Sequence, residues 1–191
     1  MDELDLADFR ARVARLYLSD ADLAGWRAGR DDLFAHHPQS PVGPGFSGLR
    51  YFPANPAAVV EVALSPAAGT LEIDTGGEDG VVRYRRVGIA ATPYGELTLW
   101  WIEAYGGGLF LPVRDGTCGH ETYGGGRYLT DTVKGTHGRG VVVPAPDRVR
   151  LDFNYLYNPS CAYNEAYLCP LAPPENRLTA RIEAGEMVYD A

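Results

Sequence analysis

The chain of 191 residues is poor in lysine, cysteine and methionine, and it carries a deficit of basic charge. Lys134 is its one lysine, and 17 basic against 25 acidic side chains give a formal net charge of −8. An acidic surface repels nucleic-acid phosphates and anionic lipids, so we expect neither a nucleic acid nor a membrane as partner. No run of 18 apolar residues is present to form a membrane-spanning helix, and the acidic start is unlike a signal peptide. We therefore expect a cytoplasmic protein.

Metal-ligating patterns are also lacking. The three cysteines contain no C-x-x-C pair, and the four histidines form neither H-x-H nor H-E-x-x-H. We therefore expect no metal site and no other cofactor. Cys118, Cys161 and Cys169 are expected to be reduced thiols, either as small packing residues or as a nucleophile or redox pair. A disulfide between Cys161 and Cys169 is expected only in an exported protein.

Two amphipathic helices are expected before residue 38. Apolar residues recur at spacings of three and four in residues 6–17, and the apolar positions of the second helix are Leu23, Trp26, Leu33 and Phe34. Ser19 is the predicted N-cap of the second helix, with Asp20 and Asp22 in its first turn. The proline- and glycine-rich residues 38–48 then predict an irregular connector.

The remaining chain has the pattern of an antiparallel β protein. Short β-branched and aromatic segments alternate with glycine-rich turns that are too short for crossover helices. Ten strands are expected, at residues 49–52, 59–64, 70–74, 81–89, 96–104, 109–114, 127–130, 141–143, 148–153 and 178–183. We predict a mainly β fold, an antiparallel β barrel or sandwich with two N-terminal α-helices. Residues 1–48 and 49–191 are expected to form one structural unit with a long ordered loop at 154–177.

That loop is the most informative segment. Residues 152–186 hold four of the five asparagines and two of the three cysteines, and four tyrosines crowd into the first half of this segment. Long ordered loops are uncommon in compact domains and are often functional. Two interpretations remain open: the amide side chains fasten the loop to the fold, or they face a ligand.

The chain resembles a bacterial family of unknown function, number 1684. The resemblance rests on LDFNYLYNPSCAY at 151–163, CPLAPPENRL at 169–178, IEAGE at 182–186 and RDGTCGHETYGGGRYL at 114–129. W-R-x-x-R-D-x-L-F at 26–34, SP at 40–41 and GLRYFP at 48–53 extend it over residues 20–190. The family has no assigned reaction, so the resemblance implies an identity without a mechanism.

Glycine-rich and acidic turns supply the candidate site residues. The backbone amides of residues 124–126 and the guanidinium of Arg127 could bind a carboxylate or phosphate, or Arg127 could pair with Asp115 or Glu121 in a structural turn. Carboxylates at strand ends could perform acid–base chemistry or could cap turns. The catalytic candidates are Asp115 and Asp152. The ligand-binding candidates are Tyr123, Arg127, Asn154, Tyr157, Asn158, Cys161, Tyr163 and Asn176.

Aromatic side chains could complete a pocket. Six of them are candidates to line a concave, half-apolar site: Trp100, Trp101, Tyr105, Tyr155, Tyr157 and Tyr163. The functional hypothesis is a small-molecule-binding protein, with a carboxylate or phosphate on the ligand and metal-independent acid–base catalysis as an option. The alternative is a non-catalytic interaction or structural module in which the motif residues only fasten the long loop.

Overall fold

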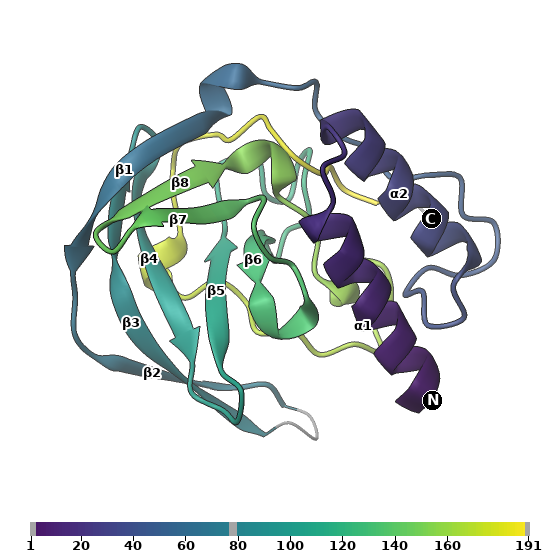
Figure 1. The fold of residues 1–191 in the computed structure, drawn as a ribbon, viewed down its shortest axis with the longest axis horizontal. Coiled ribbons are helices and arrows are strands. Elements are labelled where there is room, and N and C mark those ends of the chain that lie inside the picture. Colours follow the sequence, from purple (N-terminus) through teal and green to yellow (C-terminus); the bar gives the residue numbers. More distant parts are fainter. Residues whose placement is uncertain (1–2, 77–79, 190–191) are drawn as a thin grey trace.

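The computed structural model describes residues 3–76 and 80–189. Helices α1 (Glu3–Leu18) and α2 (Leu23–His36) are followed by the irregular connector that the prolines and glycines predict. The two helices lie side by side next to the curled sheet (Figure 1). In the described part of the chain, no helix is long and apolar enough to cross a membrane.

The second helix begins later than the sequence suggested. Asp22 is its N-cap, and its carboxylate accepts a hydrogen bond from the Gly25 backbone at 2.8 Å. The predicted cap, Ser19, instead donates its hydroxyl to the Leu16 carbonyl at the end of α1. The prediction of Ser19 was wrong because both residue types cap helices well, and only the position of the chain reversal selects between them.

Eight antiparallel strands form one strongly curled sheet. They are β1 (Val59–Pro66), β2 (Thr70–Asp74), β3 (Val81–Thr92), β4 (Gly95–Ile102), β5 (Gly108–Val113), β6 (Arg127–Asp131), β7 (Val141–Ala145) and β8 (Arg148–Asp152). The main order is β6-β5-β4-β3-β1-β8-β7, with β2 paired to β3. The predicted mainly β, antiparallel fold with two N-terminal helices is confirmed. Residues 49–52 and 178–183 form no strand, contrary to expectation.

The long strand β3 explains part of the curl. Its first half pairs with β2 and its second half with β1, and its register with β4 shifts between Arg86 and Gly88. A bulge of this kind bends and twists a strand. Gly88 is needed at the bend because a Cβ there would lie 2.5 Å from Leu64 Cγ. At Gly140, just before β7, a Cβ would lie 2.2 Å from the Leu129 carbonyl of β6, so the far ends of the sheet approach one another.

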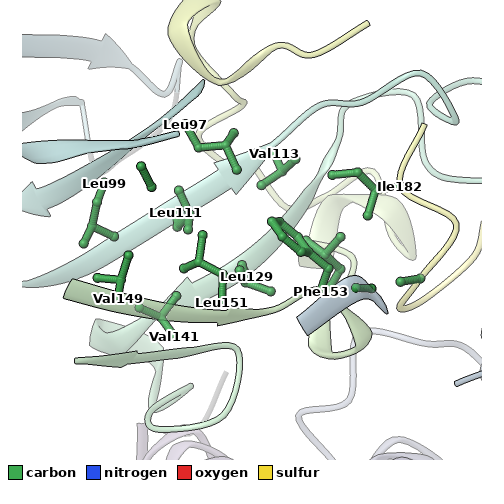
Figure 2. Close-up of a cluster of buried hydrophobic side chains, with 14 residues drawn as sticks. Leu97, Leu99, Leu111, Val113, Leu129, Val141, Val149, Leu151, Phe153 and Ile182 are labelled. Atoms are coloured by element: carbon green, nitrogen blue, oxygen red, sulfur yellow. The ribbon is translucent and has the colours of Figure 1, made fainter. Parts of the chain in front are cut away.

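Strands β4 to β6 are covered on both faces. Alternate residues point to opposite sides of a strand, and here Leu111 and Leu129 enter an aliphatic core while Phe110 and Tyr128 enter an aromatic one. Figure 2 shows the aliphatic side chains gathered between β4–β6 and β7–β8. The aromatic cluster adds Tyr17 and Trp26 of the helices and residues of the late loop. These are its members: Tyr17, Trp26, Tyr84, Trp100, Phe110, Tyr128, Tyr155 and Tyr157.

We expect Leu129→Ala to destabilise the fold by about 2 to 5 kcal/mol, because Leu129 is fully buried and its removal leaves a cavity. Urea unfolding followed by tryptophan fluorescence measures this change. Val143→Ala in β7 is the matched control, since Val143 is 53% exposed and its truncation should move the midpoint little. An equal loss of unfolding free energy in both variants would contradict the buried position of Leu129.

Candidate functional site

The predicted pair Asp115 and Arg127 meets in the interior. Their side chains are each 1% exposed, and Arg127 Nη2 lies 3.0 Å from Asp115 Oδ2. Arg127 opens β6 directly after Gly126, whose φ of +96° favours glycine. Burial lowers the pKa of Arg127, and the Asp115 carboxylate opposes that shift. The structural alternative offered by the sequence, an Arg127–Asp115 pair, is the arrangement observed.

The same guanidinium holds the C-terminal segment. Arg127 Nη1 donates to the carbonyls of Ala184 and Glu186, and Nη2 donates to that of Ile182. Asp115 Oδ2 accepts from the Ile182 amide at 2.8 Å. Both charged groups are therefore engaged by the protein itself.

A second buried cluster centres on Glu186, whose carboxylate is fully buried. Arg30 Nη2 lies 2.8 Å from Oε2, and Asn158 donates its backbone and side-chain N–H groups to the same carboxylate. The hydroxyl of Tyr163 also donates to Oε1. Burial raises the pKa of Glu186, while Arg30 and these hydrogen bonds oppose the shift. This cluster joins α2, the late loop and the C-terminal segment.

Beside this cluster lies a small cavity of about 70 Å³, lined in part by Tyr157, Asn158 and Tyr163. Asn158 Oδ1 is buried there and has no hydrogen-bond partner among the described residues. The hydroxyl of Tyr157 lies 3.1 Å from Thr136 Oγ1. Sites for organic ligands usually span about 300 to 1,000 Å³, so this cavity is far below that size.

The remaining polar candidates fasten the loop at other points. Asn154 exchanges two hydrogen bonds with the Asn55 backbone and donates to Asp152 Oδ1 at 2.9 Å. Asn176 donates to the Thr98 carbonyl and accepts from Trp100 Nε1 at 3.0 Å. Asp152 thus lies with Asn154, away from the Asp115–Arg127 pair, and the two catalytic candidates share no described contact.

The aromatic candidates do not form one pocket. Trp100, Tyr155 and Tyr157 are buried members of the aromatic cluster, whereas Tyr105 is completely exposed. Large aromatic rings contribute most of their stabilisation by burial, which explains why three of the six are core residues.

Two open clefts flank Leu168 of the late loop. The first, here called the loop cleft, has a volume of about 740 Å³ and lies between β2 and residues 161–177. Two of the predicted ligand residues, Tyr123 and Cys161, line it, and the Tyr123 hydroxyl lies 3.7 Å from Cys161 Sγ. Burial, together with Cys161, raises the pKa of Tyr123 to about 12. The residues that line it are Leu71, Glu72, Ile73, Asp74, Thr75, Tyr123, Cys161, Glu165, Tyr167, Leu168, Cys169, Leu171, Ala172, Pro173, Pro174 and Arg177.

The second, here called the strand cleft, has a volume of about 780 Å³ and is lined by β3, the end of β4 and Asp131 to Lys134. It shares Glu72, Thr75 and Leu168 with the loop cleft. Asp131 is 4% exposed, its Oδ1 has no hydrogen-bond partner among the described residues, and its Oδ2 lies 3.8 Å from Lys134 Nζ. Burial raises the pKa of Asp131, and Lys134 only partly offsets this effect.

Sequence reasoning missed Arg30, Glu186 and Asp131. A signal for Arg30 was present, because it lies four positions after Trp26 and three before Leu33 on the apolar face of its helix. Glu186 ends the IEAGE motif but lacks a local pattern that would mark it as buried. Asp131 ends β6 just as Asp152 ends β8, so the rule that selected carboxylates at strand ends applied to Asp131 equally.

Comparison with known proteins supplies the family. The family described as "Protein of unknown function (DUF1684)" matches residues 44–187, about three quarters of the chain. The chain belongs to this family. The matched region contains the 114–129, 151–163, 169–178 and 182–186 motifs, while the tryptophan–arginine motif at 26–34 lies outside it. No curated protein matches.

A solved relative supports the membership. The chain is similar to an uncharacterised protein of Haloarcula marismortui with a solution NMR structure, at 32% identity and a TM-score of 0.57. The alignment covers 86% of this chain and 91% of the relative. Both findings concern proteins without an assigned activity, so they leave the function to be argued from the DUF1684 chain itself.

We expect Arg127→Met to lower the free energy of unfolding by about 3 to 5 kcal/mol, because the buried Asp115 carboxylate would lose its partner. Urea unfolding gives the value, and hydrogen exchange at residues 182–186 reports release of the C-terminal segment. Arg148→Met is the matched control. Arg148 pairs with Glu61 at 2.9 Å, but both side chains are about half exposed, so the midpoint should stay nearly unchanged. A similar urea-unfolding midpoint for both variants would refute the stabilising role of the buried Arg127 side chain.

We expect Asp131→Asn to stabilise the protein by on the order of 1 kcal/mol at about pH 7, because it removes a poorly paired buried charge. With the pKa of folded Asp131 raised, the group favours folding at low pH, and this contribution is lost as the pH rises through the folded pKa. The advantage of the Asp131→Asn variant over the wild type should therefore shrink towards about pH 4. Urea unfolding at both pH values tests this, and a destabilisation at pH 7 would contradict it.

Proposed function

We propose that this DUF1684 protein binds a small, mainly apolar organic molecule in the loop cleft. The observation that carries the proposal is the cleft itself: its volume of about 740 Å³ falls within the usual range of ligand sites. Leu71, Ile73 and Leu171 give it apolar walls, and the Tyr123 hydroxyl and the Cys161 thiol provide polar groups between them. Such a mixture holds a ligand by burial and orients it by a few hydrogen bonds.

The charges of the loop cleft favour a neutral or cationic ligand over the carboxylate or phosphate that the glycine–arginine turn suggested. Glu72, Asp74 and Glu165 line it against a single basic residue, Arg177. Arg127 was the residue predicted to bind such an anion. It is 1% exposed, and it donates to backbone carbonyls and to Asp115. An anion in this cleft would meet repulsion from more charges than attract it.

Acid–base catalysis is the weaker part of the functional hypothesis. Asp115 accepts hydrogen bonds from Thr117, Arg127 and Ile182, and Asp152 caps the turn at Asn154. Binding without a reaction is therefore the proposal. We keep the cytosol as the proposed compartment, because Cys118, Cys161 and Cys169 are free thiols, and the net charge of −8 supports a partner other than nucleic acid or membrane.

An interaction module is the second candidate. It is favoured by the observation that Asn154, Asn158 and Asn176 all fasten the chain to itself. In this case the exposed Leu168 and Leu171, 56% and 47% exposed, would contact another protein instead of a small molecule.

We expect a screen of small aromatic and aliphatic compounds by ligand-detected NMR to give hits, with neutral and cationic members ahead of matched carboxylates. Leu171→Asp should weaken the best hit at least about tenfold, because it replaces an apolar wall by a charge. Val143→Asp is the control, since Val143 is comparably exposed but lies outside both clefts. If the hits bind both variants equally, or if there are no hits, the loop cleft is rejected as a ligand-binding site. The interaction module then becomes the favoured function.

A further inference from the structure

Two thiols lie together in the loop cleft. Cys161, in the 3-10 turn Ser160–Ala162, and Cys169, eight positions later, both line the cleft and both are free. Each thiol affects the pKa of the other, so the two side chains are close neighbours. Turn formation brings them together: the amide of Ala162 donates to the Pro159 carbonyl, and that of Tyr167 to the Asn164 carbonyl.

The two thiols have unequal surroundings. The Cys161 thiol and the backbone N–H groups of Ser160 and Cys161 face Cys169, and these donors lower the pKa of Cys169. The neighbouring Cys169 thiol and burial raise the pKa of Cys161. A thiolate is the reactive form of cysteine, so one member of the pair is activated and the other stays protonated.

The third cysteine differs from both. Cys118 lies by Asp115 and Thr122, each 3.6 Å from its sulfur, and burial raises its pKa. It does not line the loop cleft. Cys118 therefore serves as an internal reference for an ordinary, partly buried thiol.

We propose that Cys161 and Cys169 form a reversible intramolecular disulfide by exchange with a low-molecular-weight disulfide, with Cys169 as the attacking thiol and Cys161 as the resolving thiol. The proposal rests on the pairing of two accessible thiols at the cleft wall, and it is independent of which ligand the cleft binds.

The exchange balances in two steps. The Cys169 thiolate attacks one sulfur of the disulfide RSSR, the S–S bond breaks, and RS⁻ leaves with the electron pair and takes a proton. The Cys161 thiol then gives its proton to solvent and attacks Cys169 Sγ, which expels the second RS⁻. The sum is protein dithiol plus RSSR giving protein disulfide plus two RSH. Excess RSH reverses it.

The test uses the full-length native protein and oxidised glutathione. After incubation and acid quenching, remaining thiols are alkylated and the protein is cut with a glutamate-specific protease, which separates the two cysteines at Glu165. We expect the Cys161 and Cys169 fragments to remain joined until dithiothreitol is added, with Cys118 still alkylated. The bridge removes conformational freedom from the unfolded chain, although the loop that it closes is short, so the oxidised protein should melt about 5 °C above the reduced one.

Two variants separate the roles of the thiols. Cys161→Ser should stop at a single glutathione adduct on Cys169, and Cys169→Ser should react with glutathione disulfide at least about tenfold more slowly. The proposal is overturned if native wild-type protein keeps both thiols in excess oxidised glutathione, or if each carries its own adduct. It is also overturned if Cys161 and Cys169 react only at the rate of Cys118.

Discussion

The buried guanidinium of Arg127 is the constraint on which the rest of the molecule depends. A charge that is 1% exposed must be paired and hydrogen-bonded, or the fold pays a large desolvation penalty. Asp115 supplies the countercharge, and the carbonyls at residues 182, 184 and 186 supply the remaining acceptors. Since these carbonyls belong to the end of the chain, β6 satisfies its first residue only when the C-terminal segment lies against it.

This dependence spreads from the C-terminal segment to the helices. Once Arg127 fixes the backbone of Glu186, the carboxylate of Glu186 is presented to Arg30 of α2 and to Asn158 of the late loop. The two buried ion pairs are thus linked through one residue. Because each charge is satisfied by groups from distant parts of the sequence, loss of one element leaves unpaired polar groups in the others, which makes folding of these elements cooperative.

The architecture could be predicted from the sequence because helices and strands are marked by patterns of residues close together in the chain. Short β-branched and aromatic segments between glycine-rich turns marked the eight strands, and amphipathic patterns marked both helices. Residues 178–183 were predicted as a strand for the same reason. The chain there pairs only in part: the Leu178 amide donates to the Arg114 carbonyl and the Ala180 carbonyl accepts from the Gly116 amide, whereas the Ile182 carbonyl accepts from the Arg127 side chain. No local pattern reports that difference.

The candidate site was harder to predict, because it depends on which polar groups find partners inside the protein. The sequence grouped Arg127, Asp115 and the loop asparagines as polar residues with potential for binding, and it offered fastening as the alternative for each. Their roles separate only when contacts between residues far apart in the chain are known, such as Arg30 with Glu186 at a separation of 156 positions.

The contacts that fasten the late loop also shape the loop cleft. Asn158 ties its beginning to Glu186, and Asn176 ties its end to β4. Between these anchors the chain passes over β2, where Leu168 and Leu171 stay partly exposed and the loop cleft opens beneath. A loop without anchors would collapse its apolar side chains onto the sheet and fill that space, since burying them is favourable. The asparagines that anchor the two ends of the loop therefore also help to keep the loop cleft open.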